Sequence, residues 1–523
     1  MARMNHSFES VQERDSFARR REFMKFTGGC AALGSTSVLS QLLNLQLTGS
    51  AWAQTGGGSD YKAIVCVFCN GGADTFNLLT PYENAEHATY TTVRTVLAKP
   101  KTELLPIPVD IASPGGRKLG IHNAMPELQA LYSSGKAAFL ANVGSLVVPI
   151  SSKTAYNSSA IRKPLGLFSH SDLIQHWQTS VPQSRSQATG WGGRMADLLT
   201  STHNPTDKLS INIALGSLNV FQTGSDVLPY VVSSSGATLP SGYRTNNATG
   251  ANYDNVHNTV INGSTGVNGI YPPADSALGA LYSDLLQRSI GRVKRHSIDA
   301  AQGFYDNTDN AGTGPTGGPL PASISGPFDA IASDATIPGG LKGFAANLSM
   351  VARVIRARTS FAQTRQIFFV SLGGWDHHDN LLTSQQSMLP GLSKALSAFY
   401  NATVQLGVGD KVTTFTASDF GRTLSANVSG SDHAWGGNHI IVGGALAGGK
   451  VYGTYPDSLA LNGALDLGRG RLIPTTSVDA YNAELATWFG IPNNSLLTDI
   501  LPNVRNFYQE GAASRPIGFL PAG

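Results

Sequence analysis

The sequence predicts an α/β protein with a mostly parallel central sheet that is covered by helices on both faces. Short apolar, β-branched runs alternate with helical patterns, and each run ends at a glycine-rich or polar turn. The predicted strands span residues 63–69, 366–372, 412–417 and 439–443. Apolar residues spaced three and four apart predict helices over residues 125–133, 341–357 and 389–405. In such a sheet ligands bind at the carboxyl ends of the strands, so the polar turns form one candidate site.

The first 53 residues have the layout of a secretory signal peptide. A stretch containing Arg20, Arg21 and Lys25 precedes the weakly apolar residues 26–47, and Ala51-Trp52-Ala53 fits an A-x-A cleavage site. Residues 20–25, Arg-Arg-Glu-Phe-Met-Lys, resemble the twin-arginine consensus. Glycines and polar residues leave no run of about 20 apolar residues, which argues against a transmembrane anchor. We expect export by the Tat translocase, cleavage, a periplasmic or secreted location and no stable membrane insertion.

The mature chain, residues 54–523, is predicted to be nearly neutral. Residues 1–53 contain six of the 37 Lys and Arg residues and four of the 34 Asp and Glu residues, so their removal leaves a formal net charge of +1. No basic stripe indicates a nucleic-acid partner, and a hydrophobic content of 41% supports a globular core. We expect one large α/β domain over residues 54–523, with a Gly/Asn-rich insertion at about 230–330, rather than two domains. The sequence carries no signal for an oligomeric state.

Two cysteines, Cys66 and Cys69, remain after cleavage, and both lie on the first predicted strand. Residues three apart on a strand point to opposite faces, which is unsuited to a disulfide or a shared metal. We therefore expect two buried free thiols.

Acidic residues and histidines collect at the ends of the predicted strands. Asp74 follows the first strand in a glycine-containing turn, where a carboxylate can meet a cation. The second strand ends in Trp375-Asp376-His377-His378-Asp379, and in an extended turn Asp376 and His378 point to the same side. Imidazole with carboxylate suits zinc, manganese or iron, whereas carboxylates with water suit magnesium or calcium.

The third and fourth predicted strands add to this set. Asp419 and Arg422 follow the third strand, and Arg422 is either an ion-pair partner within the fold or a clamp for an anionic substrate. His433 precedes the fourth strand and His439 opens it. The candidate metal ligands are Asp74, Asp376, His378, Asp419, His433 and His439.

These motifs resemble a family of bacterial proteins known as domain of unknown function 1501. The resemblance rests on residues 71–74 (Gly-Gly-Ala-Asp), 374–378 (Gly-Trp-Asp-His-His), 418–423 (Ser-Asp-Phe-Gly-Arg-Thr) and 432–433 (Asp-His). That family carries twin-arginine signals and is placed in the alkaline phosphatase-like superfamily, with phosphatases, sulfatases and cofactor-independent phosphoglycerate mutases. The resemblance implies a three-layer α/β/α sandwich with long Gly/Asn-rich insertions and one or two divalent metals at the strand ends.

The resemblance also implies individual roles. Asp74 is expected as the first-strand metal carboxylate, Asp376 and His378 as the pair on one metal, and His433 or His439 as the late histidine. Two positions depart from the pattern. Phe420 stands where the superfamily often has histidine, and the family usually has Glu in place of Asp419. These departures argue against a site with two zinc ions. We expect one or two divalent ions, which are zinc, manganese, magnesium or calcium.

The resemblance places the nucleophile about 95 residues after Asp74, where Ser169 and Ser171 flank His170, and Thr75 is the rival. His170, beside Ser169, is interpreted as a helix-capping or core histidine in preference to a catalytic one. The resemblance implies an exported metal-dependent hydrolase of phosphate or sulfate esters, acting on a small anionic ester with help from Arg422. The alternative is a non-catalytic exported metal-binding or assembly protein with the same fold. Phe420 and the lack of a clear sequence motif for a nucleophile favour this alternative. A surface or adhesive protein is a third interpretation, based on the Gly/Asn/Thr-rich loops alone.

Overall fold

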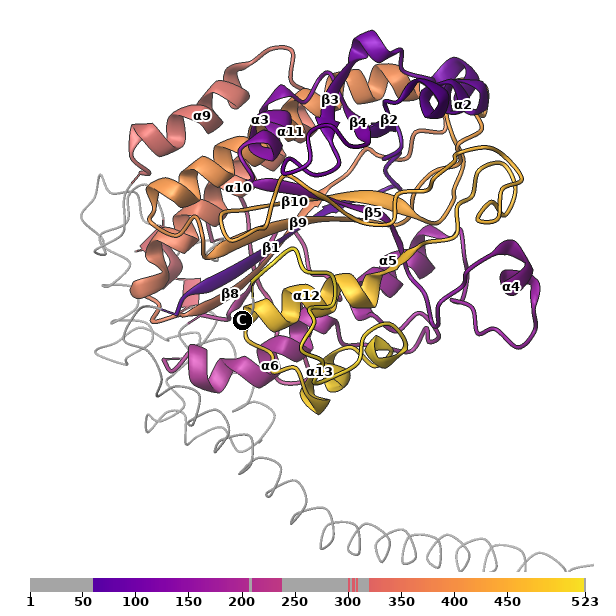
Figure 1. Cartoon of the computed structure of the whole chain (residues 1–523). Coiled ribbons are helices and arrows are strands. Elements are labelled where there is room, and N and C mark those ends of the chain that lie inside the picture. The colour runs from indigo at the N-terminus through magenta and orange to yellow at the C-terminus, as the bar shows by residue number, and fades with distance from the viewer. Residues whose placement is uncertain are drawn as a thin grey trace, which may run out of the picture. The chain divides into compact units, whose positions relative to one another are not determined.

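A mixed sheet, nine-stranded within the described residues, runs through the centre of the fold (Figure 1). The computed structural model describes residues 60–206, 209–237, 300–301, 303–305, 307–308 and 319–521. The predicted signal peptide and most of the predicted insertion lie outside these residues. No described helix is both long enough and apolar enough to cross a membrane.

The sheet has the strand order β11-β5-β10-β9-β1-β8-β6-β7, and β12 also pairs with β5. Its strands are β1 (Lys62–Cys69), β5 (Ala137–Gly144), β6 (Asn212–Leu215), β7 (Tyr230–Val232), β8 (Arg365–Leu372), β9 (Val412–Ser418), β10 (Gly437–Gly443), β11 (Val451–Gly453) and β12 (Thr476–Ser477). The central strand β1 is parallel to β8 and β9, with Val65 opposite Phe368 and Thr414. The predicted mostly parallel sheet is therefore confirmed.

Strand β10 is the exception, because it runs antiparallel to both of its neighbours. Gly437, at its start, pairs with Val143 near the end of β5, and Gly443, at its end, pairs with Thr413 near the start of β9. The amino end of β10 thus lies at the edge where the other strands have their carboxyl ends. A loop can make this antiparallel return without a crossover helix.

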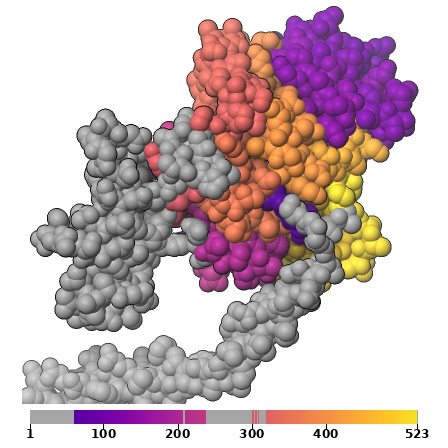
Figure 2. Space-filling view, turned by 90° about the vertical axis from the view of Figure 1, so that its left-hand side faces the viewer, coloured from indigo at the N-terminus to yellow at the C-terminus, as the bar shows by residue number. Residues whose placement is uncertain are grey.

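Helices cover both faces of the sheet, which confirms the three-layer α/β/α arrangement (Figure 1). One face carries α3 (Pro126–Ser133), α9 (Ala322–Ser333), α10 (Gly339–Arg356) and α11 (Leu381–Gln405). The other carries α5 (His170–Thr179), α6 (Trp191–His203), α12 (Val478–Phe489) and α13 (Ser495–Ile500). Figure 2 shows the surface of α9 to α11, in salmon and orange, beside the purple surface of the N-terminal part of the described chain.

The apolar core follows from the alternation of side chains along the strands. On β1, Val65 and Cys69 pack into the cluster beneath α10 and α11, whereas Cys66 and Phe68 pack into the cluster beneath α6 and α12. Both cysteines are free and buried, as predicted, and burial raises the pKa of each thiol. Opposite faces of the strand therefore hold the two thiols.

A small antiparallel sheet lies outside the central one and was not predicted. It has the order β2-β4-β3 and consists of β2 (Leu79–Pro81), β3 (Leu104–Pro108) and β4 (Lys118–His122), with helix α2 (Asn84–Arg94) in the connection. Other short helices among the described residues are α4 (Lys153–Asn157), η1 (Thr95–Leu97), η2 (Lys101–Glu103), η6 (Ala357–Thr359) and η7 (Val504–Asn506).

Helix α11 differs from its prediction at one end. The apolar spacing in the sequence places its start at residue 389. The helix begins at Leu381 instead and contains Pro390 in its interior. Leu381 and Leu389 are both fully buried, so packing against the core keeps the earlier turns helical.

Candidate metal centre

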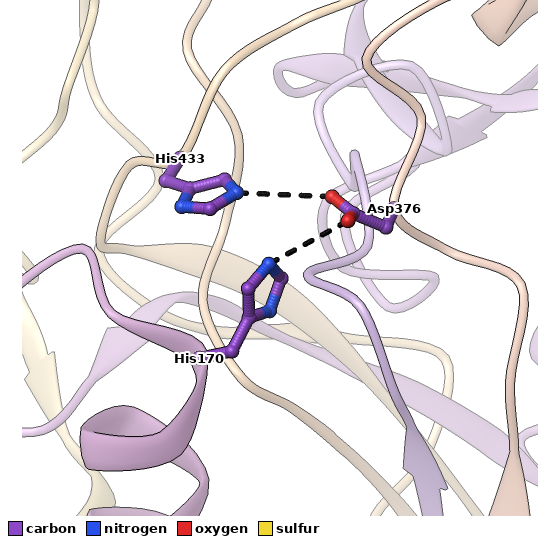
Figure 3. Close-up of side chains that lie close together, drawn as sticks. All are labelled: His170, Asp376 and His433. Atoms are coloured by element: carbon purple, nitrogen blue, oxygen red, sulfur yellow. Dashed lines mark ion pairs between the residues drawn. The ribbon is translucent and has the colours of Figure 1, made fainter.

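Three side chains from distant parts of the chain meet at the carboxyl edge of the sheet (Figure 3). Asp376 follows β8, His170 is the first residue of α5, and His433 lies in the loop that leads into β10. One ligand atom from each lies within 4.8 Å of those of the other two. Because β10 is reversed, the loop before it arrives at the same edge as the turn after β8.

The carboxylate of Asp376 is the centre of this group. Its Oδ2 lies 3.6 Å from Nε2 of His170, and its Oδ1 lies 3.1 Å from Nε2 of His378 and 3.7 Å from Nε2 of His433. The Nε2 atoms of His378 and His433 are 3.0 Å apart. Three imidazoles therefore turn the same ring nitrogen toward one carboxylate. We call Asp376, His170, His378 and His433 the His/Asp cluster.

The other ring nitrogen of each histidine faces an acceptor. Nδ1 of His170 lies 2.7 Å from Oδ2 of Asp419, Nδ1 of His433 lies 2.8 Å from the carbonyl oxygen of Phe168, and Nδ1 of His378 lies 3.5 Å from Oδ1 of Asp432. A carbonyl oxygen only accepts, so Nδ1 of His433 carries the proton and the Nε2 lone pair of the neutral ring is free. This arrangement is the one found around metal-bound histidines, whose second nitrogen donates to a carboxylate or a carbonyl.

Asp419 is buried and links the cluster to the turn after β1. Its two carboxylate oxygens accept the backbone N–H of Gly71 at 3.1 and 3.2 Å. Gly71 has a φ of +118°, and a Cβ there would lie 2.5 Å from the backbone nitrogen of Asp376. Only glycine allows this close approach, so the turn after β1 brings Asp419 and Asp376 to the same place.

Arg422 is a buried side chain whose guanidinium holds Asp376. Its Nε donates to the carbonyl of Gly72 at 2.6 Å, Nη1 to that of Ser431 at 2.5 Å, and Nη2 to that of Gly71 at 2.6 Å. Nη2 also forms an ion pair with Oδ1 of Asp376. Of the two interpretations left open by the sequence, these contacts match an ion-pair partner that orients Asp376.

The protonation states suit a cation. Burial alone would raise the pKa of Asp376, but Arg422, His378 and His170 lower it, and the net pKa lies below the ordinary value of a carboxyl group. Burial lowers the pKa of His433, and the nearby His170, Arg422 and His378 lower it further against the hydrogen bond to Phe168. The cluster therefore offers an ionised carboxylate and a neutral imidazole at pH 7.

Phe420, which stands where a histidine was expected by resemblance, forms a wall of the cluster. Its ring centroid lies 4.8 Å from that of His170 and 4.6 Å from that of His433. The ring also fills the space where a side chain at Gly72 would lie. An apolar wall of this kind restricts how the two imidazoles can turn.

Asp74 does not join the cluster but forms a buried ion pair with Arg94 of α2. Its Oδ2 lies 2.6 Å from Nη2 of Arg94, and the two side chains are 1% and 0% exposed. The same oxygen accepts from Oγ of Ser431 at 3.3 Å, and Oδ1 has no hydrogen-bond partner in the structure. Arg94 therefore neutralises Asp74 in the place where a metal was expected.

His439 also lies apart, on β10 and among aromatic rings. Its ring centroid is 4.7 Å from that of Trp177 and 6.2 Å from that of Tyr481, and its Nδ1 is 3.4 Å from Oγ1 of Thr416. Burial lowers the pKa of His439 to about 3, so the ring is neutral. Of the predicted ligands, the structure thus brings Asp376, His378 and His433 together. Asp419 contacts the cluster through Nδ1 of His170.

Neither predicted nucleophile donates or accepts a hydrogen bond within the His/Asp cluster, as far as the described residues show. Oγ of Ser169 caps α5 by accepting from the backbone N–H of Asp172 at 3.5 Å, and it lies 3.1 Å from Oγ of Ser171. Thr75 is buried, and its Oγ1 accepts from the backbone N–H of Asn438 at 2.7 Å. Both hydroxyls therefore have structural partners.

His170 and Asp432 are the members of the site that sequence reasoning did not select. His170 was interpreted as a capping or core histidine, and it does open α5, but its ring turns into the cluster. Its partner Asp419 is 249 positions away, so no local spacing reveals the pair. Asp432 was part of the Asp-His motif at residues 432–433 but was not chosen as a ligand.

The structure is thus an α/β/α sandwich with a His/Asp cluster at the carboxyl edge of its sheet. Residues 330–464 match a protein family described as "Protein of unknown function (DUF1501)". This match supports the resemblance drawn from the motifs. A search of curated proteins gave no match.

Matches from a comparison with solved structures include two of low TM-score. One is Ps i-CgsB in complex with k-i-k-neocarrahexaose, with a TM-score of 0.28, 9% identity, and coverage of 84% of this chain and 72% of that one. The other is BT1596, a 2-O GAG sulfatase, with a TM-score of 0.25, 9% identity, and coverage of 75% and 66%.

Proposed function

We propose that this protein is an exported metal-dependent hydrolase of phosphate or sulfate esters. The observation that carries the proposal is the convergence of three imidazole Nε2 atoms on the carboxylate of Asp376, within 3.1 to 3.7 Å. Each of these imidazoles has an acceptor at its other nitrogen, as metal-bound histidines do.

The donor set fits a divalent cation that accepts nitrogen ligands. His170, His378, His433 and Asp376 would hold it, and a mixture of imidazole and carboxylate favours zinc, manganese or iron over magnesium or calcium. A bound cation would supply Lewis acidity, which polarises a phosphoryl or sulfuryl oxygen and lowers the pKa of a water molecule. Arg422 and Asp419 would keep Asp376 and His170 in place while the ester is bound.

The charges around the cluster support an anionic substrate. Three carboxylates belong to the cluster or contact its histidines: Asp376, Asp419 and Asp432. Three arginines contact these carboxylates or His433: Arg422, Arg469 and Arg471. These six charges cancel, so a divalent cation would add a charge of +2 to the site. A dianionic phosphate ester or a monoanionic sulfate ester would complement that charge.

The hydrogen bonds of Ser169 and Thr75 favour water as the nucleophile over either hydroxyl. Ser169 is engaged as a helix cap, and Thr75 is buried with a backbone partner. The same observation favours the second candidate, a non-catalytic metal-binding or assembly protein, if no substrate is turned over. The two candidates share the metal centre and differ only in chemistry.

Export is part of the proposal and rests on the sequence of residues 1–53. Twin-arginine transport carries folded proteins, a route that suits a chain that must acquire its metal before it crosses the membrane. We therefore propose a periplasmic or secreted location for residues 54–523, with the Tat translocase as a transient partner.

The test uses residues 54–523, purified with their native metal. Elemental analysis is expected to find a divalent cation, and aryl phosphates or aryl sulfates are expected to be hydrolysed. The Asp376→Asn variant should lose both metal and turnover, whereas Ser169→Ala should keep both if water is the nucleophile. Bound metal without turnover of either ester would support the non-catalytic alternative, and a metal-free protein would overturn the metal centre itself.

A further inference from the structure

A tight loop beside the His/Asp cluster, residues 468–471 (Gly-Arg-Gly-Arg), contains none of the predicted site residues. The buried carboxylate of Asp466 holds this loop, because its Oδ1 accepts the backbone N–H of Gly468 at 2.7 Å and that of Gly470 at 2.8 Å. The loop also hydrogen-bonds to the segment after Arg422, through the carbonyls of Arg469 and Gly470. We call residues 468–471 the arginine loop.

Arg469 occupies a backbone conformation that favours glycine. The φ angles of Gly468, Arg469 and Gly470 are +112°, +62° and +74°, so all three lie in the left-handed region. Residues other than glycine and asparagine are unfavourable in this region. Backbone strain of this kind is concentrated at functional sites. An arginine between two glycines at this position points to a use for its guanidinium.

The guanidinium of Arg469 leads to His378 through one carboxylate. Its Nη1 lies 2.5 Å from Oδ2 of Asp432, while the other oxygen of Asp432 faces Nδ1 of His378 at 3.5 Å. The side chain of Arg469 is about half exposed, at 46%, and that of Asp432 is 21% exposed. Asn427 donates to Oδ1 of Asp432 at 2.8 Å from the other side. Asp432 is thus held between two donors with one oxygen toward His378.

Arg471 leads to His433 by two separate contacts. Its Nε donates to the backbone carbonyl of His433 at 3.2 Å. Its guanidinium also lies over the ring of Phe168, 5.2 Å from the centroid, and the carbonyl of Phe168 accepts the Nδ1 proton of His433. Both the backbone of His433 and the group that fixes its ring therefore touch Arg471.

We propose that the arginine loop positions the two facing imidazoles of the cluster, with Arg469 orienting His378 through Asp432 and Arg471 orienting His433 through its carbonyl and Phe168. Arg469 and Arg471 are positioning residues, since neither contacts the Nε2 atoms of His378 and His433 that face Asp376. The proposal rests on the metal centre proposed above but not on the hydrolytic activity.

The Arg469→Gly variant of residues 54–523 tests this directly, because glycine relieves the backbone strain and removes the guanidinium at once. We expect its melting temperature to be unchanged or higher, while its affinity for Zn²⁺ or Mn²⁺ falls about 10- to 100-fold, the usual effect of losing an outer-shell partner. Arg469→Lys should restore part of the affinity, since lysine keeps the charge but not the planar fork. Arg505→Gln, which removes an exposed pair with Glu510, serves as the matched control and should bind like the parent.

Two measurements separate this proposal from the proposed function. Chelator competition gives the dissociation constants for the two ions, and ¹⁵N spectra of the imidazoles in metal-free protein report the tautomer of His378. Parent-like affinity together with an unchanged His378 spectrum in Arg469→Gly would overturn the proposal. If the parent binds neither ion, the metal centre fails, and the spectra alone decide: a changed His378 tautomer supports the positioning role and an unchanged one refutes it.

Discussion

The Nε2 atoms of His378 and His433 face each other at 3.0 Å, while the Nδ1 atoms of the same rings face Asp432 and Phe168. Because Nδ1 of His433 donates to the carbonyl of Phe168, Nε2 of the neutral His433 ring is an acceptor. Nε2 of His378 can meet that lone pair either as an N–H donor or through a cation that both rings bind. The close approach of the two Nε2 atoms therefore supports the proposed metal centre, and the metal content of variants tests it.

Replacing His433 with alanine should remove the metal from the His/Asp cluster. The variant loses one nitrogen ligand and leaves Phe168 without its donor, so we expect the purified protein to contain little bound metal by elemental analysis. His87→Ala is the matched control, because His87 is a half-buried histidine that bonds to the carbonyl of Lys99 at 3.0 Å in the outer part of the fold. Equal metal content in the two variants would contradict the assignment of His433.

Asp419→Asn should weaken metal binding with little loss of fold. The asparagine carbonyl can still accept the N–H of Gly71, but the negative charge that holds Nδ1 of His170 is gone. We expect the metal affinity to fall about 10- to 100-fold in chelator competition. Asp197→Asn is the control, since Asp197 also accepts backbone N–H groups, those of residues 225–227, and has no part in the cluster. A loss of affinity in both variants alike would indicate general destabilisation.

Asp74 and Arg94 form a pair whose disruption should show in stability. Arg94→Leu leaves a buried carboxylate without its partner, which typically lowers the free energy of unfolding by about 3–5 kcal/mol. The double variant with Asp74→Asn should recover part of that loss, and urea denaturation measures both. Asp74→Asn alone is expected to retain the metal. Metal loss in that variant at parental stability would instead make Asp74 a ligand, as the family resemblance implies.

Asp479 gives a prediction for the dependence of stability on pH. Burial raises the pKa of this carboxyl in α12 to about 8, against smaller opposing effects of a backbone N–H and Arg194. Below about pH 4 the folded and unfolded states both hold the proton. As the pH rises toward 8, the unfolded chain releases this proton and the folded protein does not. The free energy of unfolding therefore falls by on the order of a few kcal/mol.

Asp479→Asn removes this titration. We expect the variant to gain stability relative to the parent between pH 4 and pH 8, as measured by thermal melting at both values. A difference between variant and parent that is the same at the two pH values would show that Asp479 does not titrate in this range.

The regular part of the sheet could be predicted from the sequence, because its strands carry a strong local signal. β1, β8 and β9 are short apolar runs between polar turns, and each agrees with its predicted span to within a few residues. The small sheet of β2, β3 and β4 could not be found in this way. Its strands are three to five residues long and contain Pro81, Pro106 and Pro108, so neither length nor alternation marks them.

The site could be predicted only in part, because its partners are distant in sequence. The Asp376 and His378 pair was found from their i and i+2 spacing on one turn, and the two do lie together. His439 was grouped with them because it opens a strand, but the alternation along β10 turns its ring among Trp177 and Tyr481. His170 and Asp419 meet only through the folded chain, which no local pattern encodes.

Because β10 runs antiparallel to β9, the loop that connects them can change in length without changing the geometry of the sheet. Residues 419–436 leave β9 and return along its neighbour, so this excursion begins and ends at the same edge. Extra or missing residues near the exposed Val428 would lengthen or shorten this loop without shifting any strand pairing. The loop can therefore vary in length while the strands that carry the His/Asp cluster keep their register.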